Sequence, residues 1–313
     1  MTKEIITGHE YHPVKYALSW VLWPALFAIC MVITVVGFNA GRPVLYFNIA
    51  YISLIISLFY LEKTMPHERA WYTPDGQNWA SVLHTLTSKG TVQGLLVFGG
   101  TIGLLDLFDN PSWGIWPSGA PLWAQICLGV VAAEFALYWA HRMGHEISWV
   151  WRFHAVHHSV TKLWFLNTGR FHFIDSLMSI VMAMAVLFAL GAPLEIMKWV
   201  SAITAFIGML THCNVEMRFG VLSWIFNTPG LHRWHHSKDL KEGNRNYGEN
   251  IMVWDILFGT YYDADYRPPV DIGMKDYMPK KFSRQIIWPF LPASVKQKLE
   301  PDYTPLPFIK EEK

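Results

Sequence analysis

Long apolar runs recur along this chain, and they predict membrane-embedded helices. The first extends from about residue 17 to 37 without a charged side chain and predicts a retained membrane anchor. Three more cover about 44–61, 91–108 and 121–140. A bilayer core is crossed by roughly 20 apolar helical residues. Two shorter runs, about 176–192 and 197–211, are separated by a tight turn at Pro193, so they form either a full hairpin or a pair that enters the membrane and returns.

The basic residues fall mainly on one side of this arrangement. The predicted far side carries Arg42 and, depending on where the hairpin turns, Lys198. The other side carries Lys3, Lys15, Lys63, Arg69, Lys89, Arg142, Arg152, Lys162 and Arg170. Loops rich in Lys and Arg are retained on the cytoplasmic side of a membrane. Both termini and the histidines from His141 onward are therefore predicted to face the cytoplasm. The lack of a paired dilysine or KDEL-type ending favours a bacterial inner membrane over the endoplasmic reticulum.

Composition agrees with an integral membrane protein and excludes several other classes. Hydrophobic residues make up 52% of the chain and charged residues only 16%, and the net charge of +1 disfavours nucleic-acid binding. The three cysteines form no CxxC pair, which excludes a disulfide framework, a zinc ribbon and a cysteine-ligated iron–sulfur cluster. We predict an all-α integral membrane protein with about four to six membrane-embedded helices and a cytoplasmic histidine-rich helical cap.

Histidines are concentrated in one part of the chain. Of 14 histidines, ten lie between residues 141 and 236. His141 and His145 stand four apart where the fourth run leaves the membrane, so they share one helical face. Two triplets with the spacing i, i+3, i+4 follow, namely His154, His157 and His158, and His232, His235 and His236. Each triplet should turn its imidazoles to one side of a helix, which predicts a metal site.

Four further residues have more than one interpretation. His212 ends the sixth run and is a predicted ligand, and Glu216, one helical turn later, could ligate, hold a ligand or face water. His172 is either a ligand or a hydrogen-bonded structural histidine. Glu134 shares a helical stripe with His141, so it could accept a hydrogen bond from a ligating imidazole; the alternative is a protonated or water-paired carboxyl. His9, His12, His67 and His84 lack metal-binding spacing.

This number of imidazoles exceeds the needs of one metal, which predicts two metal ions. Ligation by nitrogen without thiolate suits iron, zinc or copper. The zinc-protease motif H-E-x-x-H is absent from the sequence, which leaves two irons that activate O2 as the leading hypothesis. The alternative is a membrane transporter or sensor, but the candidate intramembrane charges, Glu134, Asp106 and Asp175, all lie near predicted span ends. Intact histidine clusters argue against an inactive binding protein.

The motifs HRMGH, HAVHH, HCN and HRWHH, with NYGENIMVWDILFGTYY after them, resemble the fatty acid hydroxylase and sterol desaturase superfamily over about residues 133–262. The resemblance implies a non-haem diiron oxygenase that hydroxylates or desaturates a lipid, such as a sterol or fatty acyl chain. It implies metal ligation by the eight histidines of the three boxes and by His212. Glu216 stands where some members have another histidine, and Phe173 replaces a proline that follows the counterpart of His172.

The resemblance also implies partners and a division of the chain. O2 chemistry of this kind needs two electrons, and the sequence has no dinucleotide motif or cysteine cluster, so a ferredoxin, flavoprotein or small cytochrome should supply them. The basic cluster of Lys280, Lys281 and Arg284 either docks that donor or faces water and lipid head groups. We expect N-terminal transmembrane helices over 1–140, a catalytic region over 141–262 that includes the hairpin at about 176–211, and a cytoplasmic tail over 263–313.

Overall fold

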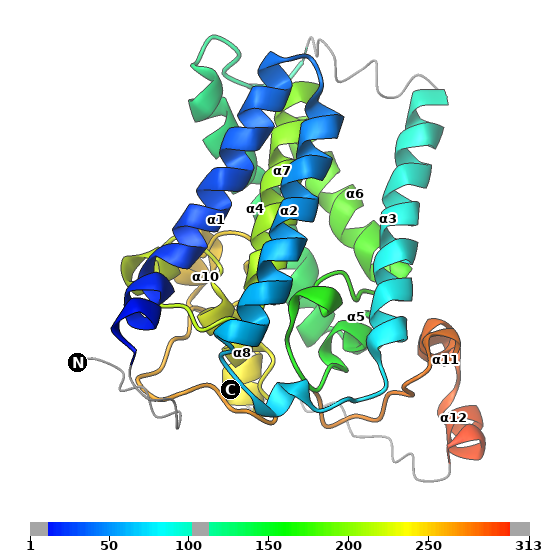
Figure 1. Cartoon of the computed structure of the whole chain (residues 1–313). Coiled ribbons are helices and arrows are strands. Elements are labelled where there is room, and N and C mark those ends of the chain that lie inside the picture. The colour runs from blue at the N-terminus through cyan, green and yellow to red at the C-terminus, as the bar shows by residue number, and fades with distance from the viewer. Residues whose placement is uncertain (1–11, 102–112, 301–313) are drawn as a thin grey trace.

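The structure is a computed structural model that describes residues 12–101 and 113–300. Within these ranges the chain is helical, with three isolated β-bridges and no strand, which confirms the predicted all-α fold. Among the described residues, four helices are long and apolar enough to cross a membrane: α1 (Pro13–Asn39), α2 (Pro43–Thr64), α4 (Leu122–Glu146) and α7 (Leu194–Thr211). The shorter apolar helix α6 (Phe173–Ala189) stands beside them (Figure 1).

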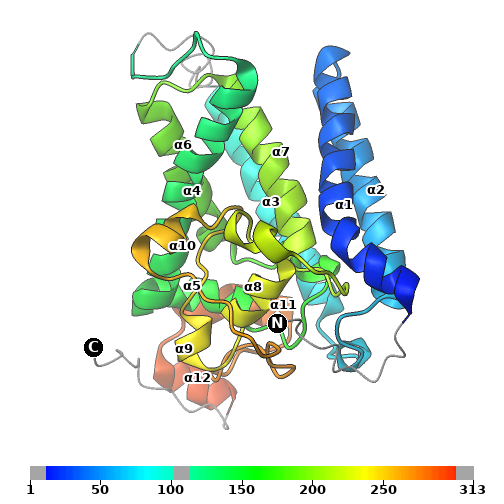
Figure 2. The same cartoon turned by 90° about the vertical axis from the view of Figure 1, so that its left-hand side faces the viewer.

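Helices α1 and α2 form a hairpin that stands at one side of the bundle (Figure 2). Both begin with proline at the first helical turn, where its missing N–H leaves no hydrogen bond unmade. Gly37 lets the helices approach closely, because a Cβ there would lie 2.4 Å from the Cβ of Tyr46. The inner face packs Leu54 and Leu58 against Phe206 and Leu210 of α7, while large apolar side chains remain exposed on the outer face, as lipid contact requires.

Helix α3 (Asn78–Thr101) differs from the sequence prediction at its start. The predicted run at 91–108 lies partly outside the described residues, but the helix already begins at Asn78. Lys89, expected in a loop, therefore lies within α3, and its ammonium group sits 4.4 Å from the ring centroid of Tyr51. A positive charge held over an aromatic face is stabilised by the ring quadrupole, which makes this helical position tolerable.

Helices α4, α6 and α7 form the centre of the bundle. Ala132 and Ala133 of α4 pack with Ile196 and Val200 of α7. The turn between α6 and α7 lies at the same end as the segment before α4, since the amide N–H of Ile115 donates to the Leu190 carbonyl at 3.1 Å. The opposite ends of these three helices lie at the other end of the bundle, beside α5 (Ser148–His158) and α8 (Pro229–His235) (Figure 1).

Short helices and connecting segments cover that opposite end, and we call them the cap (Figure 2). The cap contains α5 (Ser148–His158), α8 (Pro229–His235), α9 (Leu240–Gly243), α10 (Val253–Phe258), α11 (Phe282–Ile287) and α12 (Ala293–Leu299), with the 3₁₀ turns η1 (Ala70–Tyr72), η3 (Phe165–Asn167), η4 (Gly220–Trp224) and η5 (Trp288–Phe290). Helix α10 lies against α4, where Trp254 Nε1 donates to the Val131 carbonyl at 3.0 Å. The cap thus closes over the ends of α4, α6 and α7.

Candidate metal centre

Nine of the ten clustered histidines come together in two groups between the bundle and the cap. The five-histidine group contains His141, His145, His154, His158 and His235. The four-histidine group contains His157, His212, His232 and His236. In each group the candidate ligand atoms lie within 4.8 Å of one another. None of the nine histidines is more than 9% exposed, so the fold buries these imidazoles away from water.

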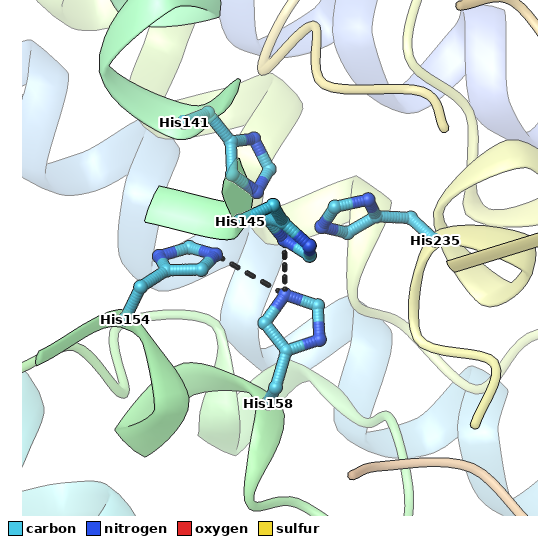
Figure 3. Close-up of side chains that lie close together, drawn as sticks. All are labelled: His141, His145, His154, His158 and His235. Carbon is cyan, nitrogen blue, oxygen red and sulfur yellow. Dashed lines mark hydrogen bonds between the residues drawn. The ribbon is translucent and has the colours of Figure 1, made fainter. Parts of the chain in front are cut away.

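The five-histidine group draws its members from three helices (Figure 3). The last two turns of α4 carry His141 and His145, α5 carries His154 and His158, and α8 carries His235. Helices α4 and α5 approach closely because residue 144 is glycine: a Cβ there would lie only 3.0 Å from Cγ of His154. A larger residue would push the two histidine pairs apart.

Each histidine triplet is divided between the two groups, a division that the spacing of the triplets did not predict. His154 and His158 enter the five-histidine group, whereas His157 enters the other. The last triplet is divided in the opposite way: His232 and His236 belong to the four-histidine group, and His235 belongs to the five-histidine group. The helical period explains the split: residues i and i+4 lie about 40° apart around the axis, whereas i+3 lies on the other side of i.

Four Nδ1 atoms of the five-histidine group face oxygen atoms that accept hydrogen bonds. His141 donates to the carbonyl of Tyr247 at 2.8 Å, and His235 donates to the carbonyl of Arg245 at 2.7 Å. His145 Nδ1 lies 3.1 Å from Asn244 Oδ1, and His154 Nδ1 lies 3.0 Å from Asp175 Oδ2. Three of these acceptors come from residues 244–247, and we call residues 244–250 the acceptor segment. A proton on each Nδ1 leaves a lone pair on each Nε2.

Those Nε2 lone pairs point toward one another, and this arrangement fits a cation. His158 Nε2 lies 3.0 Å from His145 Nε2 and 3.1 Å from His154 Nε2. The Nε2 atoms of His141 and His235 are buried with no hydrogen-bond partner. Burial and the neighbouring imidazoles hold the pKa of His158 and His235 well below its ordinary value, which disfavours protons there. Converging neutral imidazoles are the donor set that iron, zinc and copper accept.

The four-histidine group has the same inward geometry but fewer outer contacts. His236 Nε2 lies 3.2 Å from His157 Nε2 and 3.0 Å from His232 Nε2, which in turn lies 2.9 Å from His212 Nε2. Only His212 has an Nδ1 partner, Asn167 Oδ1 at 3.0 Å, whereas the other three Nδ1 atoms are buried without one. Burial lowers the pKa of His212 to about 3. The group is therefore also neutral and able to ligate a metal.

Glu134 lies near the five-histidine group but does not contact a histidine, so the predicted histidine contact is wrong. Its carboxylate accepts hydrogen bonds from the backbone N–H groups of Glu249 and Asn250 and, at 2.7 Å, from Asn250 Nδ2. Asp255 holds the same segment by accepting from the N–H groups of Tyr247 and Gly248. Glu134 thus anchors the acceptor segment, which in turn orients the imidazoles.

His172 and Glu216 lie outside both groups. His172 caps the start of α6, where its Nδ1 accepts from the Ile174 N–H, and its Nε2 donates to the Ile286 carbonyl at 3.1 Å. The helix before Glu216 ends at Thr211, so the predicted helical turn between His212 and Glu216 does not exist. Glu216 instead lies 2.7 Å from Nδ1 of His67, a histidine without metal-binding spacing.

A cavity of about 140 Å³ opens beside the five-histidine group. His145, His158 and His235 line it, together with charged residues that include Lys238, Lys275 and Asp276. Trp151 of α5 also lines the cavity, and its ring centroid lies 5.4 Å from that of His145 and 5.5 Å from that of His158. The cavity thus places charged and aromatic side chains beside three of the candidate ligands.

Sequence reasoning missed the residues that hold the imidazoles. Asp175, Asn167 and Asn244 make these contacts from positions far away in the chain. Asp175 carried a signal, since it is an ionisable residue at the end of an apolar run. The backbone carbonyls of Tyr247 and Arg245 have no side-chain signal, although the NYGEN motif marks the segment that supplies them.

Comparison with known proteins identifies the family. A family model described as fatty acid hydroxylase matches residues 126–260. The chain is 44% identical to the ornithine lipid hydroxylase OlsE of Rhizobium tropici over 279 residues, which is 88% of this chain and 84% of that relative. It is 30% identical to human alkylglycerol monooxygenase over 161 residues, 50% of this chain and 33% of that protein. A putative Delta(7)-sterol-C5(6)-desaturase 2 of Arabidopsis thaliana is 27% identical, over 43% of this chain and 47% of its own length.

No solved structure matches the chain. These relatives are a hydroxylase, a monooxygenase and a putative desaturase, and they do not favour the transporter or sensor alternative. The match to the ornithine lipid hydroxylase covers 88% of the chain and so includes both the bundle and the cap. The four candidate spans and the two histidine groups agree with it. The chain therefore belongs to the fatty acid hydroxylase family of iron-dependent enzymes, and it is a multi-pass membrane oxidoreductase that hydroxylates or desaturates lipids.

Proposed function

We propose that this chain hydroxylates an ornithine-containing lipid at a centre of two irons held by the nine grouped histidines. The observation that carries the substrate proposal is the 44% identity to an ornithine lipid hydroxylase, which extends over 84% of that relative. The cavity beside the five-histidine group supports a polar substrate portion, because Lys238, Lys275 and Asp276 offer charges of both signs in its walls. A hydrocarbon chain would gain nothing from these charges.

The division of the histidines supports two irons, one in each group. Five or four neutral imidazoles suit one divalent metal, and nine exceed the coordination number of a single ion. Bound iron would supply the activation of O2, by which a C–H bond, O2, two electrons and two protons become an alcohol and water. His172 and Glu216 are assigned structural roles, because their side chains bond to the protein outside the two groups.

The protein's own residues orient the ligands and exclude water. The acceptor segment and Asp175 hold the Nδ1 protons of four imidazoles in the five-histidine group, so that their Nε2 lone pairs stay directed inward. The Asp175 carboxylate also brings a negative charge within hydrogen-bond distance of His154, which compensates part of the charge of a bound cation. Burial of all nine side chains keeps bulk water away from the reacting atoms.

The two electrons come, in this proposal, from a separate ferredoxin, flavoprotein or small cytochrome, since the sequence contains no electron-carrying motif. The cap and both termini face the cytoplasm of a bacterial cell, and the enzyme lies in the inner membrane. The distribution of Lys and Arg supports this orientation, because the loops at the cap end carry most of them.

Lipid mass spectrometry tests the proposal. The chain is expressed in a bacterium that makes ornithine lipids, with His235→Ala at matched protein level as the control. We expect ornithine lipids to gain about 16 Da, one oxygen atom, only with the unaltered chain. A loss of about 2 Da would instead indicate desaturation, and a shift confined to another lipid class would refute the ornithine substrate. An unchanged lipid profile with iron-loaded protein would refute the lipid hydroxylase proposal.

A further inference from the structure

Glu62 is a buried carboxylate near the cap end of α2, with only 4% of the residue exposed. One of its oxygens, Oε1, accepts two backbone hydrogen bonds at 2.9 Å, from the N–H groups of Phe165 and Asn214. The donors belong to segments that are far apart along the chain. Burying a carboxylate is unfavourable unless it is hydrogen-bonded. These two hydrogen bonds therefore offset part of the free-energy cost of burying Glu62.

Both segments lead to the four-histidine group. Phe165 begins η3, which ends at Asn167, and Asn167 Oδ1 is the acceptor for Nδ1 of His212. Asn214 lies two residues after His212 itself. A single oxygen of Glu62 therefore fixes the segment that carries the ligand and the segment that carries the ligand's hydrogen-bond partner.

The His212–Asn167 hydrogen bond matters more to the four-histidine group than any single Nδ1 hydrogen bond matters to the five-histidine group. Four Nδ1 atoms of the five-histidine group have acceptors, whereas His212 alone has one in the four-histidine group. The His212–Asn167 pair is thus the one hydrogen bond that orients an imidazole of this group from its Nδ1 side. Loss of its alignment would leave all four Nδ1 atoms of the group without an acceptor.

We propose that Glu62 is a positioning residue for metal binding by the four-histidine group, acting through the His212–Asn167 hydrogen bond. The inference rests on the proposed metal centre and extends it to α2, which lies outside the family match at residues 126–260. Both backbone bonds use one oxygen, and an amide oxygen accepts as well, so the position requires an acceptor at Oε1 rather than a negative charge. Glu134 differs, because its backbone and side-chain contacts use both oxygens.

The test compares Glu62→Gln and Glu62→Leu with Gln125→Leu. Gln125 is a matched control, since it is a buried polar residue of α4 that bonds the Ser118 and Ala120 carbonyls at the far end of the bundle. Iron per chain is measured after loading and dialysis against a chelator, with Mössbauer spectra to separate the two iron environments and thermal unfolding of the apoprotein to measure general damage.

We expect Glu62→Leu to lose one iron environment selectively, with its affinity reduced about 10- to 100-fold. Glu62→Gln should retain both irons, and Gln125→Leu should lower the unfolding temperature without changing iron content. Equal iron affinity in Glu62→Leu and the unaltered protein would overturn the inference, as would an equal loss in the Leu and Gln variants.

Asn167→Ala keeps the inference testable if Glu62→Leu does not fold, because it removes the His212 acceptor directly. Iron binding in Asn167→Ala with unaltered affinity would overturn the inference. Failure of the proposed function gives a different result: unaltered protein would then bind no iron, and the positioning role would fall with it. Two irons in the unaltered protein together with two in Glu62→Leu would overturn only the role of Glu62.

Discussion

Replacement of Asp175 by alanine should weaken iron binding in the five-histidine group. Asp175 Oδ2 lies 3.0 Å from Nδ1 of His154, and the two side chains are only 5% and 3% exposed. Without the carboxylate, the Nδ1–H of His154 is left buried without this acceptor, and the ring loses the contact that directs its Nε2 inward. Asp175→Asn keeps an oxygen that can accept, but it removes the negative charge.

The size of the effect follows from the hydrogen bond. A hydrogen bond to a charged group contributes about 1.5–3 kcal/mol, and a neutral one about 0.5–1.5 kcal/mol. Since about 1.4 kcal/mol is tenfold in an equilibrium constant, Asp175→Ala should lower iron affinity about 10- to 100-fold. Asp175→Asn retains a neutral hydrogen bond and should lower it about tenfold or less. These values agree with the usual effect of removing the hydrogen-bond partner of a metal-binding histidine.

The assay is competition for iron between the purified protein in mild detergent and a chelator of known affinity. Glu195→Gln is the matched control: like Asp175 it is an acidic residue in the first turn of its helix, so both interact with a helix dipole, but Glu195 belongs to the first turn of α7 at the other end of the bundle. The reasoning is refuted if Asp175→Ala binds iron as tightly as the unaltered chain, or if Glu195→Gln loses as much affinity.

Three further predictions follow from the site and the bundle. His157→Ala and His235→Ala remove ligands from different groups, so each should lose about one iron per chain and all hydroxylation, while the exposed His12→Ala should lose neither; full iron content in both ligand variants would contradict the assignment. Glu134→Ala should lower iron affinity about 10- to 100-fold by releasing the acceptor segment, and unchanged chelator competition would exclude that role. A reporter fused at residue 115 should appear on the opposite side of the membrane from one at either terminus, and a cytoplasmic signal would show the span count to be wrong.

Local patterns along the chain were enough to predict the class of the fold and the histidines of the site. Apolar runs of membrane length predict α1, α2 and α4 to within a few residues, because the bilayer imposes a length that the sequence must satisfy locally. The histidine boxes are equally local, since spacings of three and four residues place side chains on one part of a helix. The box spacings therefore predicted eight of the nine grouped histidines, and the position of His212 at the end of the sixth apolar run predicted the ninth.

The division of these histidines into two groups, and the contacts that hold them, depend on packing between segments that are distant in the chain. His157 and His235 join groups other than those of their neighbours. The helical period gives these rings a different direction, and the way α5 and α8 face each other and α4 selects the group that each ring enters. The partners of the imidazoles lie from 10 to 106 residues away and include backbone carbonyls, which every residue possesses. Glu134 shares a helical stripe with His141, yet its carboxylate meets the acceptor segment. Helical spacing sets the face of a side chain, and packing between distant segments selects the atom that it meets.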